Sequence, residues 1–137
     1  MNKVTAIHGL YNEHLQSLAT AEKWPVRYQG GSYGAVSGPY LRAWVLPSES
    51  MAAWLGSGSP NKLRCIYQID VVTGFGGWGP TAGIADKVAT HFKKGQRLKN
   101  SDVSIRFLKV SLRPARADGA EYIQTIDVVT DILARED

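Results

Sequence analysis

The chain has 137 residues, of which 44% are hydrophobic and 20% charged, a composition typical of one globular domain spanning residues 1–137. A core of this size needs no metal or disulfide, and the single cysteine, Cys65, has no partner for an internal disulfide. Glycine and proline interrupt the longest uncharged stretches, which argues against a membrane span, and no signal-peptide pattern opens the chain. We therefore expect a soluble protein made in a reducing cytoplasm.

The net charge of +4 is unevenly distributed along the sequence. Residues 91–116 include eight basic residues and one acidic residue, a net charge of +7 that leaves −3 for the rest of the chain. Such asymmetry suits contact with nucleic acid or with the acidic face of a neighbouring subunit, and it also suits a basic face that only meets solvent. These three interpretations stay open on charge alone.

The first predicted element is an amphipathic helix over residues 3–19. Its apolar residues recur at helical spacing, and they are Val4, Ile7, Tyr11, Leu15 and Leu18. His8 and His14 lie six positions apart, which separates them around the helix and excludes them as a metal-binding pair. We expect His14 to lie beside the apolar stripe without a chemical role.

Turn-forming residues dominate the segment 20–39. Trp24, Val26 and Tyr28 alternate within it and predict a short strand, which Pro25 confines to a sheet edge. A second strand is predicted over 40–46, where Pro47 ends it. The sequence leaves 48–55 open between a helical turn and an extended arm, and the composition of 56–61 predicts a loop.

The clearest strand pattern lies at 64–72. Alternation places Cys65, Tyr67, Ile69 and Val71 on a buried face and Arg64, Gln68 and Asp70 on an exposed one. A buried Cys65 is expected to be an inert thiol. The glycine-rich loop at 75–80 lacks the lysine and hydroxyl of a phosphate loop and the glycine spacing of a dinucleotide site.

A second helix is predicted from Thr81, as its N-cap, to about Phe92, with Gly95 ending it. Its apolar residues are Ile84, Ala85, Val88, Ala89 and Phe92. A strand is predicted at 103–110, with Phe107 on its inward face. A turn is predicted at 113–119 and the last strand at 122–133. The pentapeptide Ile-Asp-Val-Val-Thr occurs at 69–73 and at 126–130, which suits two neighbouring strands with the same face buried.

This order of elements predicts an α+β fold, with an antiparallel or mixed β-sheet of about five strands and two α-helices packed on one face. No nucleophile, base and orienting group are spaced so as to converge, and no spacing of His, Cys, Asp and Glu matches a metal site. We therefore predict a protein that is not an enzyme, with no catalytic residue, cofactor or metal. Asp70 and Asp127, at matching places in the repeated pentapeptide, are interpreted as surface residues and not as an acid–base pair.

Four segments carry a family resemblance. They are residues 38–42 (Gly-Pro-Tyr-Leu-Arg) with Leu46 and Pro47, residues 65–71 with the glycine-rich loop after them, residues 84–89 with His91 and Phe92, and Gly95 with Leu98. On these residues the chain resembles a bacteriophage tail-terminator-like family of small proteins from long-tailed phages. The resemblance covers nearly the whole chain, and its motifs are structural.

The resemblance implies a structural virion protein of the tail or neck, assembled in the host cytoplasm. Such a protein would form a ring, expected to be a hexamer, on the end of the tail tube, stop tube polymerisation and form the joint to the head connector. Its partners would be itself, the tail-tube protein and the head–tail connector protein, with no membrane and with DNA only in transit through the ring. The alternatives are another neck protein, for head or tail completion, and a basic nucleic-acid-binding module.

A ring requires one patch of each subunit to meet a different patch of the next. Loop aromatics either pack back on the core or fill a pocket on a partner, and basic residues suit an acidic neighbour. We expect the subunit and partner contacts to use Trp54, Phe75, Trp78, Lys93, Lys94, Arg97, Lys99, Arg113 and Arg116.

Overall fold

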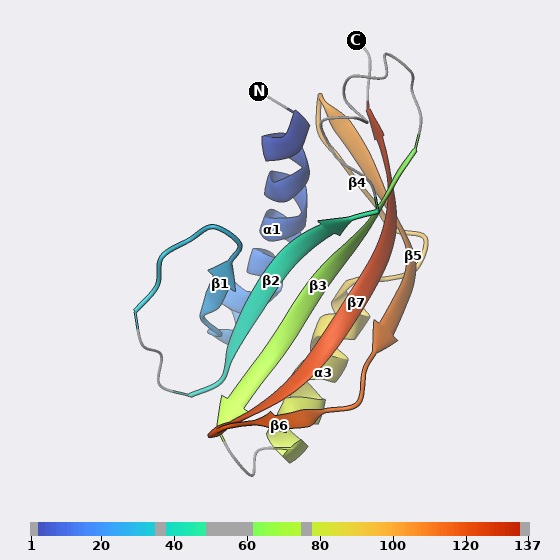
Figure 1. The fold of residues 1–137 in the computed structure, drawn as a ribbon. Coiled ribbons are helices and arrows are strands. Elements are labelled where there is room, and N and C mark those ends of the chain that lie inside the picture. Colours follow the sequence, from blue (N-terminus) through green and yellow to red (C-terminus); the bar gives the residue numbers. More distant parts are fainter. Residues whose placement is uncertain (1–2, 35–37, 49–61, 75–77, 135–137) are drawn as a thin grey trace.

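A computed structural model of the chain describes residues 3–34, 38–48, 62–74 and 78–134. Within them, two helices, α1 (Lys3–Glu22) and α3 (Trp78–His91), lie on one face of a single mixed sheet (Figure 1). The prediction of an α+β fold with both helices on one face is confirmed. No described helix is long and apolar enough to cross a membrane.

The sheet has seven strands, where the sequence predicted about five. The predicted strands appear as β1 (Val26–Tyr28), β2 (Tyr40–Pro47), β3 (Leu63–Gly74), β5 (Val103–Leu112) and β7 (Glu121–Ala134). The two additional strands are β4 (Arg97–Lys99) and β6 (Arg116–Asp118). The turn predicted at 113–119 is therefore wrong for residues 116–118, which are too few to reveal an alternating pattern.

The strand order is β1-β2-β3-β7-β5-β4, with β6 pairing to β7, and of these pairings only that of β1 with β2 is parallel. The two strands that share the pentapeptide, β3 and β7, lie side by side with Ile69 opposite Ile126. Both isoleucines are buried in the core beneath the helices, so Asp70 and Asp127 face the opposite side of the sheet. The expected adjacency of the two copies is confirmed.

The interpretation of Asp70 as a surface residue is wrong. The sequence placed Asp70 on an exposed face, but this residue is only 5% exposed. Its carboxylate accepts hydrogen bonds from Arg42 (2.9 Å) and from the Thr125 hydroxyl (2.6 Å), which come from the strands on either side. Neighbouring side chains thus enclose this carboxylate on the face away from the helices.

The core lies between the helices and the sheet, and β3 buries the predicted residues Cys65, Tyr67, Ile69 and Val71. Tyr11 of α1 stacks on Tyr67, with ring centroids 4.5 Å apart. The Thr130 hydroxyl donates to the Cys65 carbonyl at 3.0 Å, so the Tyr11 hydroxyl donates in turn to Thr130. This chain of contacts fixes α1 against the two central strands.

The helix α3 begins three residues before its predicted start. Thr81 was expected to cap the helix, but the helix begins at Trp78, and the buried Thr81 hydroxyl contacts the Thr73 hydroxyl at 2.6 Å. Pro80 fits in the first turn because the first amides of a helix have no partner within it. The N-cap prediction is therefore wrong, while the end of the helix at His91 agrees with the expected end near Phe92.

The two edges of the sheet differ. On the β1 side, the Tyr28 amide donates to the Tyr33 hydroxyl, the Gly31 amide donates to the Tyr28 carbonyl, and the Gln29 side chain accepts from the Val45 amide. On the other side, β4 pairs with β5 only over 104–106. Among the described residues, no strand lies beside the outer edge of β5 from 109 to 112.

Candidate functional site

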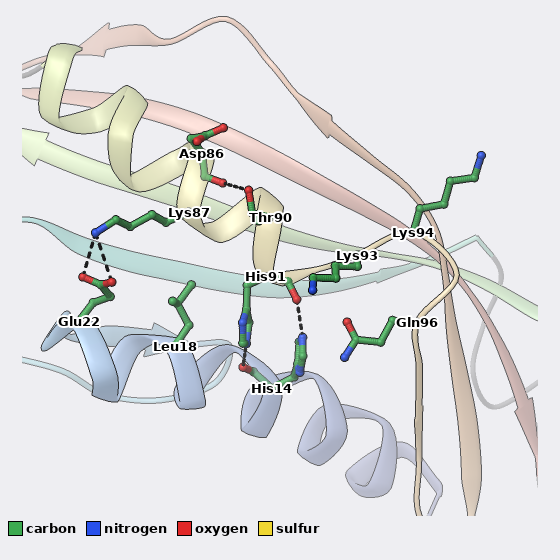
Figure 2. Close-up of a pocket in the computed structure, with 10 residues that line it drawn as sticks. All are labelled: His14, Leu18, Glu22, Asp86, Lys87, Thr90, His91, Lys93, Lys94 and Gln96. Carbon is green, nitrogen blue, oxygen red and sulfur yellow. Dashed lines mark hydrogen bonds and ion pairs between the residues drawn. The ribbon is translucent and has the colours of Figure 1, made fainter.

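A groove of about 840 Å³ runs between α1 and α3 (Figure 2). Glu22 and Lys87 form an ion pair of 3.2 Å across one part of it. Lys93 and Lys94 come just after the end of α3 and border the groove, and the Lys94 side chain extends away from it (Figure 2). Neither lysine forms an ion pair with a described residue. The groove is lined by His14, Leu18, Glu22, Asp86, Lys87, Thr90, His91, Lys93, Lys94 and Gln96.

Two histidines from the two helices meet in this groove. The rings of His14 and His91 stack with centroids 4.1 Å apart and planes 18° from parallel. Nε2 of His14 lies 2.9 Å from the His91 carbonyl oxygen, and Nε2 of His91 lies 2.7 Å from the His14 carbonyl oxygen. Because a carbonyl only accepts, each Nε2 carries a proton and donates it.

This arrangement is structural. The Ser17 hydroxyl is 3.1 Å from Nε2 of His91, but that nitrogen already carries the proton it gives to the His14 carbonyl, and Ser17 donates to the same carbonyl at 2.7 Å. The imidazole is therefore not oriented to take a proton from Ser17. Burial lowers the pKa of His14, which favours its neutral form.

A second groove, of about 630 Å³, lies between the end of α3 and β5. It shares Thr90, Lys93 and Lys94 with the first groove, so the two lysines separate the two hollows. We call Lys93 and Lys94 the lysine ridge. The second groove is lined by Ala89, Thr90, Phe92, Lys93, Lys94, Leu108, Lys109 and Val110.

The structure does not describe all nine residues expected at contacts. Trp54 and Phe75 lie outside the described residues, and Trp78 is described only as the first residue of α3. The basic residues Arg97 and Lys99 lie on β4.

Two further basic residues expected at contacts have partners within the chain. Arg113 forms an ion pair with Asp127 (2.8 Å), and Arg116 donates to the Thr125 hydroxyl (3.1 Å). Both arginines contact β7 in this way, so a neighbouring subunit that bound them would have to compete with Asp127 and Thr125.

Sequence reasoning missed the histidine pair and the groove beneath it. His14 and His91 are 77 positions apart, and the resemblance that includes His91 does not link it to His14. Only the packing of α1 beside α3 brings them together. Among the described residues, no three His, Cys, Asp or Glu side chains are grouped so as to hold a metal ion.

Comparison with known proteins gives three results. No curated protein sequence matches the chain. One solved structure shares the fold with a TM-score of 0.77 and 20% sequence identity, and the match covers 100% of this chain and 98% of the other. A family model described as "Phage tail terminator protein" matches residues 6–129, which is most of the chain. The chain therefore belongs to the phage tail terminator family, whose members are structural proteins of the phage tail.

Proposed function

We propose that this protein caps the phage tail tube as a ring of identical subunits, stops tube polymerisation and forms the joint to the head connector. The family match over residues 6–129 carries this proposal. The fold is compatible with it, because one face of the sheet carries the two helices and the other carries the charged residues Arg64, Arg97 and Arg106, and a ring joins unlike patches.

The sheet edges bear on how such a ring is joined. Joining subunits head to tail through one continuous sheet needs two open edges, and at the β1 edge the outward amide and carbonyl of Tyr28 are already bonded to Tyr33 and Gly31. This favours a joint made by side-chain surfaces. The lysine ridge is the best candidate for one half of the joint, because it is exposed and stands between two grooves.

We therefore propose that the lysine ridge meets an acidic surface of the next subunit. The remainder of the chain outside 91–116, with its net charge of −3, supplies the complementary charge. Such a contact would weaken as ionic strength rises, because exposed charges are screened.

The test is assembly with purified tail-tube protein. We expect the wild-type protein to shorten tubes measured by electron microscopy, and light scattering to show a ring or a monomer that joins tube ends. The double variant Lys93→Glu/Lys94→Glu should lose this capping, while Arg97→Glu/Lys99→Glu, which reverses two charges on β4, should keep it. Tubes of equal length with and without the wild-type protein would overturn the proposed function. If the Lys93→Glu/Lys94→Glu variant still capped tubes, the proposed function would stand but the role of the lysine ridge in it would be wrong.

A further inference from the structure

A row of charged residues crosses the sheet on the face opposite the helices. Strand pairing places Arg64 of β3 opposite Asp131 of β7, Asp131 opposite Arg106 of β5, and Arg106 opposite Arg97 of β4. Lys99 is two residues beyond Arg97 on the same strand and so faces the same side. Three arginines and a lysine thus share this face of the sheet with one carboxylate.

A small hollow lies within this row, with a volume of about 50 Å³. It is lined by Lys62, Arg97, Ser104, Arg106, Asp131 and Leu133. Pockets for drug-sized ligands measure about 300–1,000 Å³, whereas one water takes about 30 Å³ in the liquid, so this hollow suits one small ion.

The charges around the hollow are unbalanced. Asp131 is already engaged, because Nε of Arg64 lies 2.7 Å from its Oδ1. Within the described part of the chain, Lys62, Arg97 and Arg106 form no ion pair. Like charges directly opposite each other on paired strands repel, and Arg97 and Arg106 are such a pair.

An oxyanion between these two guanidinium groups would turn their repulsion into two charge-assisted attractions. Each guanidinium offers a planar set of N–H donors that matches the oxygens of a phosphate, and hydrogen bonds to charged groups are the stronger ones. The Ser104 hydroxyl lines the same hollow and adds a further donor.

We infer that this cluster, comprising Lys62, Arg97, Lys99 and Arg106, binds the phosphodiester backbone of a nucleic acid. A single carboxylate would neutralise one of these exposed cations, whereas duplex DNA presents one negative charge per about 1.7 Å of its axis. Phe107, the aromatic residue of β5, is buried on the other face of the sheet and is not placed to stack on bases. Binding through phosphates alone is independent of base sequence.

This inference does not depend on the proposed ring, and it is tested without tube protein. The experiment measures binding of a fluorescent duplex of about twenty base pairs by anisotropy, over a series of salt concentrations. The variant is Arg97→Gln/Arg106→Gln, and the control is Lys93→Gln/Lys94→Gln, which removes the same charge from the helix side. We expect the first variant to lose about tenfold in affinity and to reduce the slope of log K against log salt by about two, since each phosphate contact contributes about 0.9.

Three outcomes would overturn the inference. They are absence of duplex binding at low salt, equal losses in the variant and the control, and displacement of the duplex by poly-L-glutamate at an equal concentration of charge, which would indicate an acidic protein partner. Folding is checked by thermal unfolding, in which both variants should give a cooperative transition. Lys93→Gln/Lys94→Gln should unfold at the wild-type temperature because its replaced side chains are exposed, and Arg97→Gln/Arg106→Gln should unfold at or above that temperature because the repulsion between the two arginines is removed. Inorganic phosphate should raise the melting temperature of the wild type but not of Arg97→Gln/Arg106→Gln, and stabilisation of both alike would also count against the site.

Discussion

His14 and His91 each donate from Nε2 to the main-chain carbonyl of the other, so that two stacked imidazoles join the middle of α1 to the end of α3. Both hydrogen bonds survive protonation, because Nε2 donates in the neutral and the charged ring alike. What changes with pH is the charge: two protonated rings at this distance repel each other.

Stability should therefore fall in mild acid. Burial places the pKa of His14 below its ordinary value of 6.5, so the unfolded chain binds a proton that the folded chain resists. The contribution of His14 to the free energy of unfolding is fully present above about pH 6.5. It is lost as the pH falls below that value towards the lowered pKa. We expect the free energy of unfolding in urea to be lower near pH 5 than near pH 7.5, and His14→Gln to reduce this difference.

His8 provides the control for that experiment. Its pKa is also lowered by burial, but His91 stacks on and bonds to His14 and not His8 among the described residues, so His8→Gln should leave the His14 share of the pH dependence in place. Identical pH dependence in wild type and His14→Gln would show that the pKa of His14 is not lowered by burial.

The contact between Tyr11 and Thr130 predicts which of two substitutions destabilises the protein more. In Tyr11→Phe, Thr130 keeps its bond to the Cys65 carbonyl, and the free energy of unfolding should fall by about 0.5–1.5 kcal/mol. In Thr130→Val, the buried Tyr11 hydroxyl loses its partner, and the loss should be about 1–3 kcal/mol. Urea unfolding of both variants measures the difference, and the reverse order would contradict the assigned donor and acceptor.

Asp70 should contribute more to stability than its position on the face of the sheet opposite the helices suggests. Asp70→Ala removes the partner of Arg42 and Thr125 and should cost about 2–3 kcal/mol, as expected for hydrogen bonds to a charged group. Asp118→Ala, on the exposed strand β6, should change stability by less than about 0.5 kcal/mol. Arg42→Met/Asp70→Leu should recover part of the loss, because no unpaired charge remains.

The thiol of Cys65 should be unreactive in the folded protein. Cys65 is buried, and burial raises its pKa to about 12, so little thiolate exists at neutral pH. A chromogenic thiol reagent should react with one group per chain only after denaturation. Leu112→Cys, at a position that is 45% exposed, should add one fast-reacting thiol and so show that the reagent works. Fast reaction of the folded wild type would contradict the burial of Cys65.

The long elements were predictable because their burial pattern is local. The alternation in β3 and the four-residue spacing of Ile7, Tyr11 and Leu15 follow directly from the periods of strand and helix. The repeated pentapeptide also indicated that β3 and β7 are neighbours, which the structure confirms. These features fix the fold and the face on which the helices lie.

The short elements and the side-chain pairs were not predictable in the same way. β4 and β6 have three residues each and exist because β5 and β7 offer them an edge. The burial of Asp70 depends on Arg42 and Thr125, which lie 28 and 55 positions away. The row of Arg64, Asp131, Arg106 and Arg97 likewise arises from strand order, which alternation within a strand does not reveal.

The hydrogen bonds of Tyr28 also bear on how another copy of the chain could approach the β1 edge. Its outward amide and carbonyl are already bonded to Tyr33 and Gly31, so a strand from another copy could pair there only after these bonds break. A Cβ at position 31 would overlap the ring of Tyr33, so the ring, and with it the hydroxyl that accepts from Tyr28, would have to shift. A single methyl group at this turn would therefore reopen a hydrogen-bonding position on the edge of the sheet.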